Sequence, residues 1–174
     1  MRGEDDEREF RASTRHPFPP GQRPDVPTEH RQCLAAYVEV NGVKAYALFD
    51  SGSTTVSVTP DFAKVSRIPL VALENPVTLQ LGCVGSRSKI NFGASVDIKV
   101  GPVNDLQYVD IVNIDRYDMI VGTPFMYRFG VCLDFARRSV SVRGKDIPLL
   151  GDSDQLATAK RRVISAPRIQ SKQH

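Results

Sequence analysis

The chain reads Ala47-Leu-Phe-Asp-Ser-Gly-Ser-Thr-Thr-Val56 at the point where an apolar strand ends in a carboxylate. Asp50 follows apolar residues, and Ser51 and Gly52 then permit a tight loop before β-branched residues resume. Such a loop holds a carboxylate in a fixed position that backbone N–H groups can approach. Because Asp-Ser-Gly also occurs as an ordinary Asx-turn, its meaning depends on the sequence around it.

The sequence on both sides of this loop predicts short strands joined by turns. Residues 36–40 alternate apolar and polar side chains and end in Asn41-Gly42, a dipeptide typical of a tight hairpin, and residues 43–49 resume as its second strand. Residues 77–81 and 90–92 flank a Gly- and Ser-bearing segment, which predicts a long hairpin with a mobile tip over 82–88. Further strands are expected within 54–59, 94–100, 106–113 and 131–143.

Helical signals are few. The run Thr123-Pro-Phe-Met-Tyr-Arg-Phe-Gly130 offers Thr123 as an N-cap, Pro124 at the first helical position and Gly130 as a stop. Residues 60–65 are the other stretch with helical character. One well-delimited helix in a turn-rich β sequence predicts an all-β, small closed barrel with one short helix.

Composition argues against several kinds of catalysis. The three histidines lie outside the predicted core, at positions 16, 30 and 174. The core therefore has no imidazole for Ser-His-Asp or Cys-His chemistry, and we expect neither a metal nor another cofactor. Cys33, Cys83 and Cys132 are odd in number and lack C-x-x-C spacing, so we expect reduced, buried thiols.

Charge and proline divide the chain into three parts. Residues 1–31 are charged and hold five of the twelve prolines, which predicts a disordered linker. Residues 32–150 form the folded core, with a net charge of +1 that gives no reason to invoke nucleic acid. Residues 151–174 read as a basic tail in which residues 155–164 could form a short helix. Its cluster Lys160-Arg161-Arg162 could touch RNA, although solvated tail charge is the simpler interpretation.

The N-terminal residues are charged with no apolar stretch behind them, and no apolar run approaches the ~18 residues typical of a membrane span. We therefore expect an intracellular, cytoplasmic protein with no membrane contact.

A second motif, Tyr117-Asp-Met-Ile-Val-Gly122, stands directly before the predicted helix. The chain resembles the retropepsin-like aspartic proteases in the order and spacing of three motifs. These are Leu48-Phe49-Asp50-Ser51-Gly52, the 82–88 hairpin, and Ile120-Val121-Gly122 with its following helix. The resemblance covers residues 34–145 and is closest to proteases of gypsy-type retrotransposon polyproteins. It implies an aspartic endopeptidase that hydrolyses a retroelement polyprotein between apolar residues, in the cytoplasm or a retroelement particle.

Aspartic proteases use two carboxylates that share one proton. This chain carries one Asp-Ser-Gly, so the resemblance implies a symmetric homodimer in which Asp50 is the base in one subunit and the acid in the other. By position, Ser51 would brace the paired loops, Gly52 would offer its N–H to the carboxylate, and Ser53 would bond its outer oxygen. The flap tip that would close over an extended polypeptide substrate comprises Val84, Gly85 and Ser86. The supporting loop comprises Ile120, Val121 and Gly122.

Two other interpretations remain open. Asp50 could be a turn residue in a non-catalytic dimerisation or peptide-binding module that keeps the barrel. The chain could also be the protease domain of a cellular ubiquitin-shuttle protein, which would share the fold, although no ubiquitin-like segment supports this.

Overall fold

The computed structural model describes residues 21–80 and 87–151. They fall into two units, one ending at Gln32 and the other beginning at Cys33. Within its described part, the first unit contains a single 3-10 turn, η1 (Thr28–Arg31), in which the N–H of His30 donates to the carbonyl of Pro27 at 3.0 Å. The helix expected over residues 155–164 lies outside the described residues.

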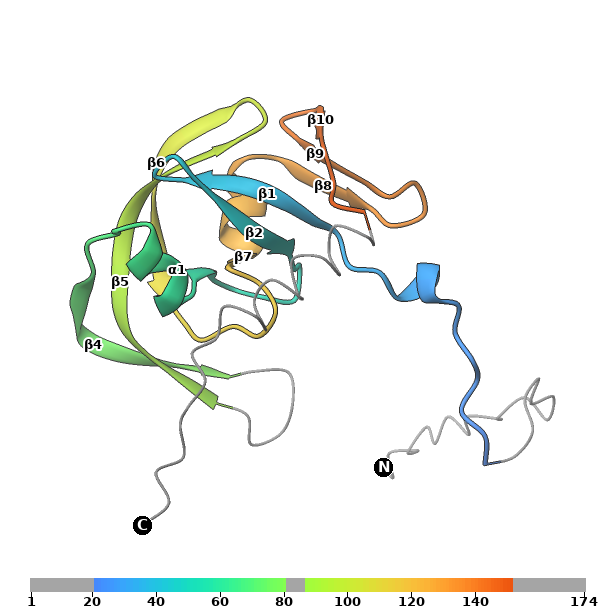
Figure 1. Ribbon diagram of the computed structural model, residues 1–174, viewed down its shortest axis with the longest axis horizontal. Helices are drawn as coiled ribbons and strands as arrows, with labels where there is room; N and C mark the ends of the chain where they lie inside the picture. Colours follow the sequence, from blue (N-terminus) through green and yellow to red (C-terminus); the bar gives the residue numbers. More distant parts are fainter. Residues whose placement is uncertain (1–20, 81–86, 152–174) are drawn as a thin grey trace, which may run out of the picture. The chain divides into compact units, whose positions relative to one another are not determined.

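The described part of the second unit is built almost entirely from strands. Its elements in chain order are β1 (Ala35–Val40), β2 (Val43–Phe49), β3 (Val56–Val58), α1 (Pro60–Val65), β4 (Val71–Gln80), β5 (Arg87–Val100), β6 (Val103–Ile111), β7 (Met119–Val121), α2 (Thr123–Arg128), β8 (Val131–Asp134), β9 (Ser139–Val142) and β10 (Lys145–Ile147). Six strands pair in the order β1-β2-β7-β3-β6-β5, and β5 pairs back to β1. The predicted all-β closed barrel is therefore confirmed (Figure 1).

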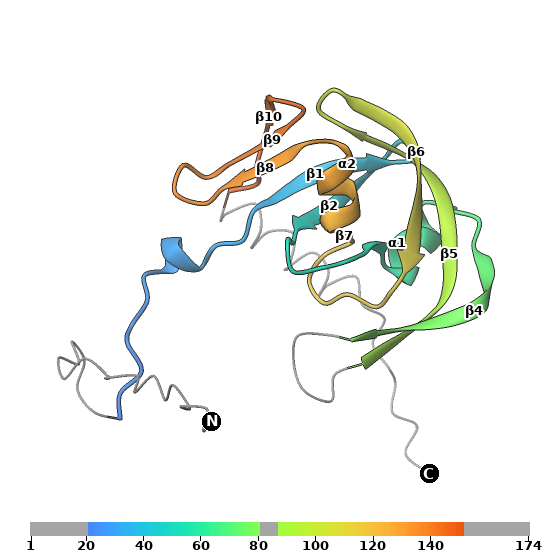
Figure 2. The same ribbon diagram turned by 180° about the vertical axis from the view of Figure 1, so that it is seen from behind.

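Strands β8, β9 and β10 form a separate three-stranded sheet. Figures 1 and 2, which view the molecule from opposite sides, both place this sheet across the barrel from β4. Strand β4 continues the barrel sheet beyond β5, and the two form the predicted long hairpin, in which Gln80 pairs with Arg87. The tip of this hairpin, residues 81–86, lies outside the described residues.

The β1–β2 hairpin closes the barrel through its turn. Asn41 and Gly42 have φ angles of 48° and 77°, which are the left-handed values that a two-residue hairpin turn requires. The N–H of Asn41 donates to the carbonyl of Asp97 at 2.9 Å, and its side-chain oxygen accepts from the N–H of Asp97 at 2.8 Å. The turn therefore extends the short β1–β5 pairing that joins the two ends of the sheet.

Alternation along the strands fills the barrel with apolar side chains. On β5, Ala94, Val96, Ile98 and Val100 are buried, while the intervening Ser95, Asp97 and Lys99 face solvent. Phenylalanines from the helical regions close the barrel core, and these are Phe62, Phe125 and Phe129. Burial of each such side chain contributes about 1.5–3 kcal/mol to the free energy of unfolding.

The described residues contain two short helices, one more than the barrel with one short helix that the sequence predicts. Residues 60–65, the other stretch with helical character, form α1, and the Thr59 hydroxyl caps it by accepting from the N–H of Phe62 at 3.1 Å. The N-cap of α2 is Gly122 and not Thr123, so that assignment was wrong by one residue. Thr123 is the first residue of α2, and its N–H donates to the carbonyl of Ser53 at 2.9 Å. The predicted stop at Gly130 lies one residue beyond the C-cap and has a left-handed φ of 57°.

The expectation of buried thiols was wrong for two of the three cysteines. Cys33 and Cys132 are free and exposed. Cys33 lies before β1 begins, and the side chain of Cys132 alternates outward from β8 between the half-buried Val131 and Leu133. Cys83 lies outside the described residues.

A close approach at Gly122 ties the second motif to the first. A Cβ built on Gly122 would overlap the carbonyl oxygen of Thr55 and lie 2.6 Å from that of Ser53. Only a residue without a side chain lets the chain after β7 pass this close to the loop between β2 and β3.

Tyr108 makes a similar contact on the outer face of the barrel. Its ring covers Gly93 on the neighbouring strand, where a Cβ would overlap the phenol, and its hydroxyl donates to Asp110 at 2.8 Å. Partial burial and this hydrogen bond to a carboxylate raise the pKa of Tyr108 from 10.0 to about 12.

We predict that Gly122→Ala lowers the free energy of unfolding by about 2 kcal/mol or more, because the methyl group forces the Asp50 loop away from β7. Urea unfolding measures this change. The neighbouring Thr123→Ala is the control and should change stability by less than about 0.5 kcal/mol, since Thr123 is exposed. Equal effects of the two substitutions would contradict the close approach.

We also predict that stability falls between pH 10 and pH 12, because the unfolded chain has then released the Tyr108 proton while the folded chain still holds it. Tyr108→Phe keeps the ring over Gly93 but has no proton to release, so its stability should fall less over this range. Asp110→Asn should give an intermediate loss. Urea unfolding at the two pH values provides the comparison, and identical losses in all three proteins would refute the assignment.

Candidate active site

Asp50 lies at the end of β2, where three strands of the barrel meet. Strand β2 runs parallel to β7, with Phe49 beside Val121, and the N–H of Asp50 donates to the carbonyl of Val121 at 3.1 Å. After the loop, β3 returns on the other side of β7, and Val56 pairs with Val121 in the antiparallel sense. The two motifs found in the sequence are therefore neighbouring strands of one sheet.

The loop after Asp50 is closed by its own backbone. The N–H of Gly52 donates to Oδ1 of Asp50 at 2.9 Å, and the N–H of Ser53 donates to the carbonyl of Asp50 at 3.1 Å. A Cβ on Gly52 would stand 3.2 Å from the same Oδ1, which is a crowded contact. Glycine therefore suits this position, and its N–H holds the half-buried carboxylate in place.

The hydroxyl groups in the loop after Asp50 differ in exposure and in their hydrogen-bond partners. Ser51 is exposed at the tip. The hydroxyl of Ser53 lies 3.3 Å from the carbonyl of Thr55 and 3.4 Å from its N–H, and the Thr55 hydroxyl lies 2.8 Å from that of Ser57. In the single chain Ser53 thus engages Thr55, and its reach to Asp50 stays a prediction.

The supporting loop (residues 120–122) packs against the loop that begins at Asp50, residues 50–55, which we call the acid loop. Val121 and Gly122 are buried, Val121 supplies the acceptor for the N–H of Asp50, and Gly122 lies against Thr55. The next residue, Thr123, donates its N–H to the carbonyl of Ser53. Ile120 is half-buried and faces the opposite side of β7 from Val121. Val84, Gly85 and Ser86 of the predicted flap tip lie outside the described residues.

A hollow of about 360 Å³ opens beside Asp50. It is lined by the acid loop, by Leu79 on β4, by Ile120 on β7 and by the segment between β6 and β7. Apolar side chains on these elements alternate with hydroxyl, amide and carboxyl groups, a combination suited to a peptide, which has both apolar side chains and a polar backbone. Sequence reasoning did not single out Leu79 or residues 112–115, because nothing local indicates that they fold over Asp50.

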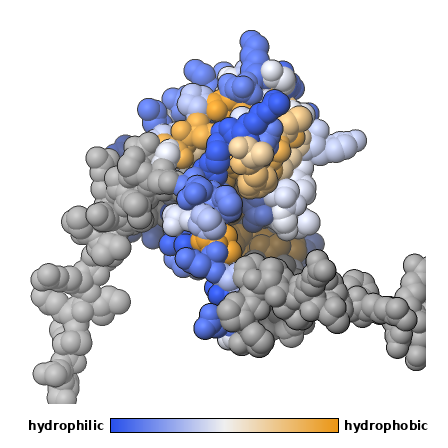
Figure 3. All heavy atoms as spheres, turned by 90° about the vertical axis from the view of Figure 1, so that its right-hand side faces the viewer, coloured by the Kyte–Doolittle hydropathy of each residue, from blue (hydrophilic) through white to orange (hydrophobic). Residues whose placement is uncertain are grey.

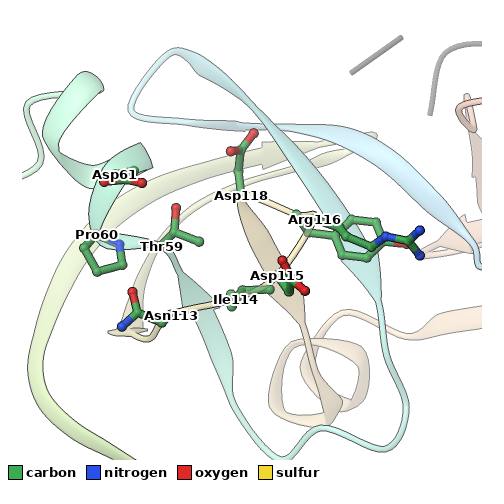
Figure 4. A pocket seen from close by; sticks show the side chains of 9 residues that line it. Thr59, Pro60, Asp61, Asn113, Ile114, Asp115, Arg116 and Asp118 are labelled. Carbon is green, nitrogen blue, oxygen red and sulfur yellow. The ribbon is translucent and has the colours of Figure 1, made fainter. Parts of the chain in front are cut away.

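A second hollow, of about 240 Å³, lies along residues 113–118 (Figure 4). Figure 4 shows Thr59, Pro60 and Asp61 at the start of α1 on the side away from Arg116. Residues 113–115 line both hollows, so this segment is shared between them. Asp118 anchors the segment, since its Oδ2 accepts from the N–H of Tyr46 at 2.9 Å and its carbonyl accepts from the N–H of Thr59 at 2.9 Å.

An aromatic row continues from this segment along the outside of β1 and β2. The rings of Tyr46 and Tyr117 lie 4.9 Å apart, and those of Tyr37 and Tyr46 lie 6.5 Å apart. Burial is the main cause that raises the pKa of the Tyr117 phenol, and the neighbouring Cys33 raises it further. Sequence reasoning missed this row, since its members come from three strands or loops.

The described residues contain no group of three or more His, Cys, Asp or Glu side chains placed to hold a metal ion. Among the same residues, no helix is long and apolar enough to cross a membrane.

Comparisons with known proteins find relatives of this chain. DNA damage-inducible protein 1 of Neurospora crassa is 27% identical over 133 residues, which are 76% of this chain and 30% of that protein. The UBA domain-containing protein Mud1 of Schizosaccharomyces pombe is 27% identical over 129 residues, which are 70% of this chain and 36% of Mud1. The chain thus spans about a third of the length of these relatives. They are not retrotransposon polyproteins, so they do not support the gypsy-type assignment made from the sequence.

Among solved structures, the retroviral protease-like domain of Ddi1 from Leishmania major matches with a TM-score of 0.55 at 14% identity, over 70% of this chain and 97% of that domain. This likeness concerns the fold. A family model described as retroviral aspartyl protease matches residues 26–146, which is more than half of the chain. The chain belongs to the retroviral aspartyl protease family.

Proposed function

We propose that this chain is an aspartic endopeptidase that cleaves extended polypeptide and is active as a homodimer. The observation that carries the proposal is the carboxylate of Asp50, which the N–H of Gly52 fixes beside a hollow suited to a peptide. One carboxylate cannot act as both base and acid in the same step. A second copy of the same loop supplies the missing group without any further residue type.

The proposed chemistry follows from two carboxylates that share a proton. Two such groups about 3 Å apart cannot both ionise, so one is charged and the other is protonated. The charged Asp50 takes a proton from water, which attacks the peptide carbonyl, while the protonated Asp50 of the second copy donates to the carbonyl oxygen. The first Asp50 then passes the proton taken from water to the amide nitrogen, the C–N bond breaks, and a hydroxyl of the tetrahedral intermediate returns a proton to the second Asp50, which restores the pair.

The other predicted roles remain part of this proposal. Ser51, exposed at the loop tip, would meet its counterpart across the two-fold axis. Ser53 would have to turn from Thr55 to reach the carboxylate. The hairpin of β4 and β5 would carry the flap over the substrate, and Leu79 on this hairpin already borders the hollow.

For the substrate, we propose an extended segment of another polypeptide with apolar residues at the scissile bond, since Leu79, Val112 and Ile120 line the hollow. The sequence motifs favour a retroelement polyprotein as its source. The names of the relatives, DNA damage-inducible protein 1 and a UBA domain-containing protein, favour a cellular protein instead. Digestion of candidate substrates from both sources separates these alternatives.

A second candidate is a non-catalytic dimerisation or peptide-binding module with the same barrel. The engagement of Ser53 with Thr55 favours it, because this hydroxyl is then not aimed at Asp50. The two candidates are separated by incubating the purified chain with an unfolded protein at mildly acidic pH, with and without pepstatin. Cleavage that pepstatin blocks decides for the protease, and an intact substrate decides for the module.

We predict that Asp50→Asn lowers hydrolysis to below a few per cent of the natural rate while the fold and the dimer persist, because an amide keeps the shape but cannot shuttle protons. Circular dichroism and sedimentation accompany the activity measurement. Asp97→Asn, on the outer face of β5, is the control and should retain full activity. Substantial cleavage by Asp50→Asn would assign the chemistry to other residues.

We also predict that specific activity falls on dilution, because each subunit supplies half of the dyad and a monomer is inactive. The rate per chain is followed across protein concentrations around the dimer dissociation constant, which sedimentation provides. A rate per chain that stays constant in a monomeric sample would refute the shared site.

A further inference from the structure

We propose that Asp115 makes the substrate hollow selective for polypeptides that carry a lysine or arginine close to the apolar residues at the scissile bond. This inference rests on the proposed function and goes beyond it, because it names the class of substrate that the hollow beside Asp50 takes. The apolar lining residues alone would admit many sequences, whereas a charged lining residue discriminates among them.

Asp115 lies where two hollows meet. It lines the hollow of about 360 Å³ beside Asp50, and it also lines the hollow of about 240 Å³ that reaches the start of α1. Asn113 and Ile114 are the other residues that the two hollows share. A polypeptide that is bound in the first hollow and continues along these three residues therefore passes beside the carboxylate of Asp115.

The carboxylate of Asp115 is accessible to a ligand. Asp115 is exposed, and within residues 21–80 and 87–151 no basic side chain forms an ion pair with it. The N–H of Tyr117 donates to the backbone carbonyl of Asp115 at 3.0 Å, so this contact leaves the carboxylate unaffected. An incoming cation can therefore approach Asp115 without displacing a basic side chain of the described core.

The neighbouring Arg116 is directed elsewhere. Figure 4 shows its side chain extending away from Asp61 and the start of α1. Burial raises the pKa of the Tyr117 phenol, and the charge of Arg116 opposes this rise, which places the guanidinium near that phenol. Arg116 thus lies toward the aromatic row and not across the second hollow.

The substrate hollow carries negative charge. Its acidic lining residues are Asp50 and Asp115, and the described residues that line it include no lysine, arginine or histidine. Asp61 and Asp118 line the adjoining hollow. Such an arrangement attracts a positively charged side chain and repels aspartate and glutamate.

The hairpin that borders the hollow does not offset this charge through its described basic residue. Leu79 on β4 lines the hollow and pairs with Ser88, whereas Lys89 pairs with Thr78. Neighbouring residues of a strand point to opposite faces, so Lys89 lies on the face of the hairpin opposite Leu79.

Apolar surface alone does not distinguish the hollow from the rest of the molecule. Figure 3 shows one face, on which several patches of hydrophobic surface lie among hydrophilic surface. Val71 on β4 and Leu106 on β6 are each 62% exposed. A carboxylate beside the apolar residues of the hollow therefore adds a requirement that apolar contacts cannot impose.

The test uses peptides with one apolar pair and a lysine, glutamine or glutamate placed in turn at each flanking position. A reduced bond replaces the scissile amide in the binding series, so that affinity is measured by fluorescence anisotropy without cleavage, and an intact amide gives kcat/KM. At one position we expect the lysine peptide to bind at least about fivefold more tightly than the glutamate peptide in low salt. An ion pair with an exposed carboxylate strengthens binding about two- to fivefold, and repulsion of glutamate adds to the difference. Added salt should reduce the ratio, because screening weakens such a pair.

Substitutions assign the preference to Asp115. Asp115→Asn should bring the ratio below about twofold, and Asp115→Lys should reverse it in favour of glutamate. Asp97→Asn removes a charge from the outer face of β5 and should keep the natural ratio. Circular dichroism verifies the fold, and the glutamine peptide gives the reference affinity of each variant.

The outcomes separate the inference from the proposed function. Equal affinities for lysine and glutamate peptides at every position, or a ratio that Asp115→Asn leaves unchanged, would overturn the role of Asp115, and cleavage of the same peptides would leave the protease intact. A lysine preference that depends on Asp115, in a chain that cleaves none of the peptides, would support the inference and overturn the proposed function in favour of a peptide-binding module. A chain that binds none of the peptides would overturn both.

Discussion

The position of Asp50 depends on the pairing of β2 with β7. The hydrogen bond from the N–H of Asp50 to the carbonyl of Val121 joins segments about seventy residues apart. The next residue, Gly122, has no side chain, which lets the end of β7 lie against the carbonyls of Ser53 and Thr55 in the same loop. Strand β7 is only three residues long and is buried between β2 and β3, so its register is set by the two strands beside it. A shift of one residue would turn Ile120 into the core and Val121 toward the hollow.

Local sequence signals predicted the parts of the fold that depend on local chemistry. Asn41-Gly42 indicated a hairpin because its two residues accept left-handed backbone angles, and Gly52 indicated a loop around a carboxylate. The pairing of Val40 with Ile98, which closes the barrel, leaves no local signal because its partners are distant in the chain. The same holds for Leu79, Asn113 and Tyr117 around the hollows. Thr123 was misjudged as an N-cap because the tertiary contact of its N–H with Ser53 is not visible in sequence.

The chemistry proposed for the site depends on a second carboxylate, because Asp-Ser-Gly occurs once in the chain. Each chain supplies one Asp-Ser-Gly carboxylate, and the central region has no histidine that could replace the second. If the second carboxylate comes from another copy, the site and the substrate hollow both depend on the same two-fold axis. The matched residues make up about a third of the length of the relatives.

The most direct test of the shared site is the number of pepstatin molecules bound per chain, measured by isothermal titration calorimetry at mildly acidic pH. A peptide-like inhibitor that lies across a dyad built from two copies occupies both halves at once. The account predicts one inhibitor for every two chains, with binding lost in Asp50→Asn. One inhibitor bound to every chain, in a sample that sedimentation shows to be monomeric, would contradict it.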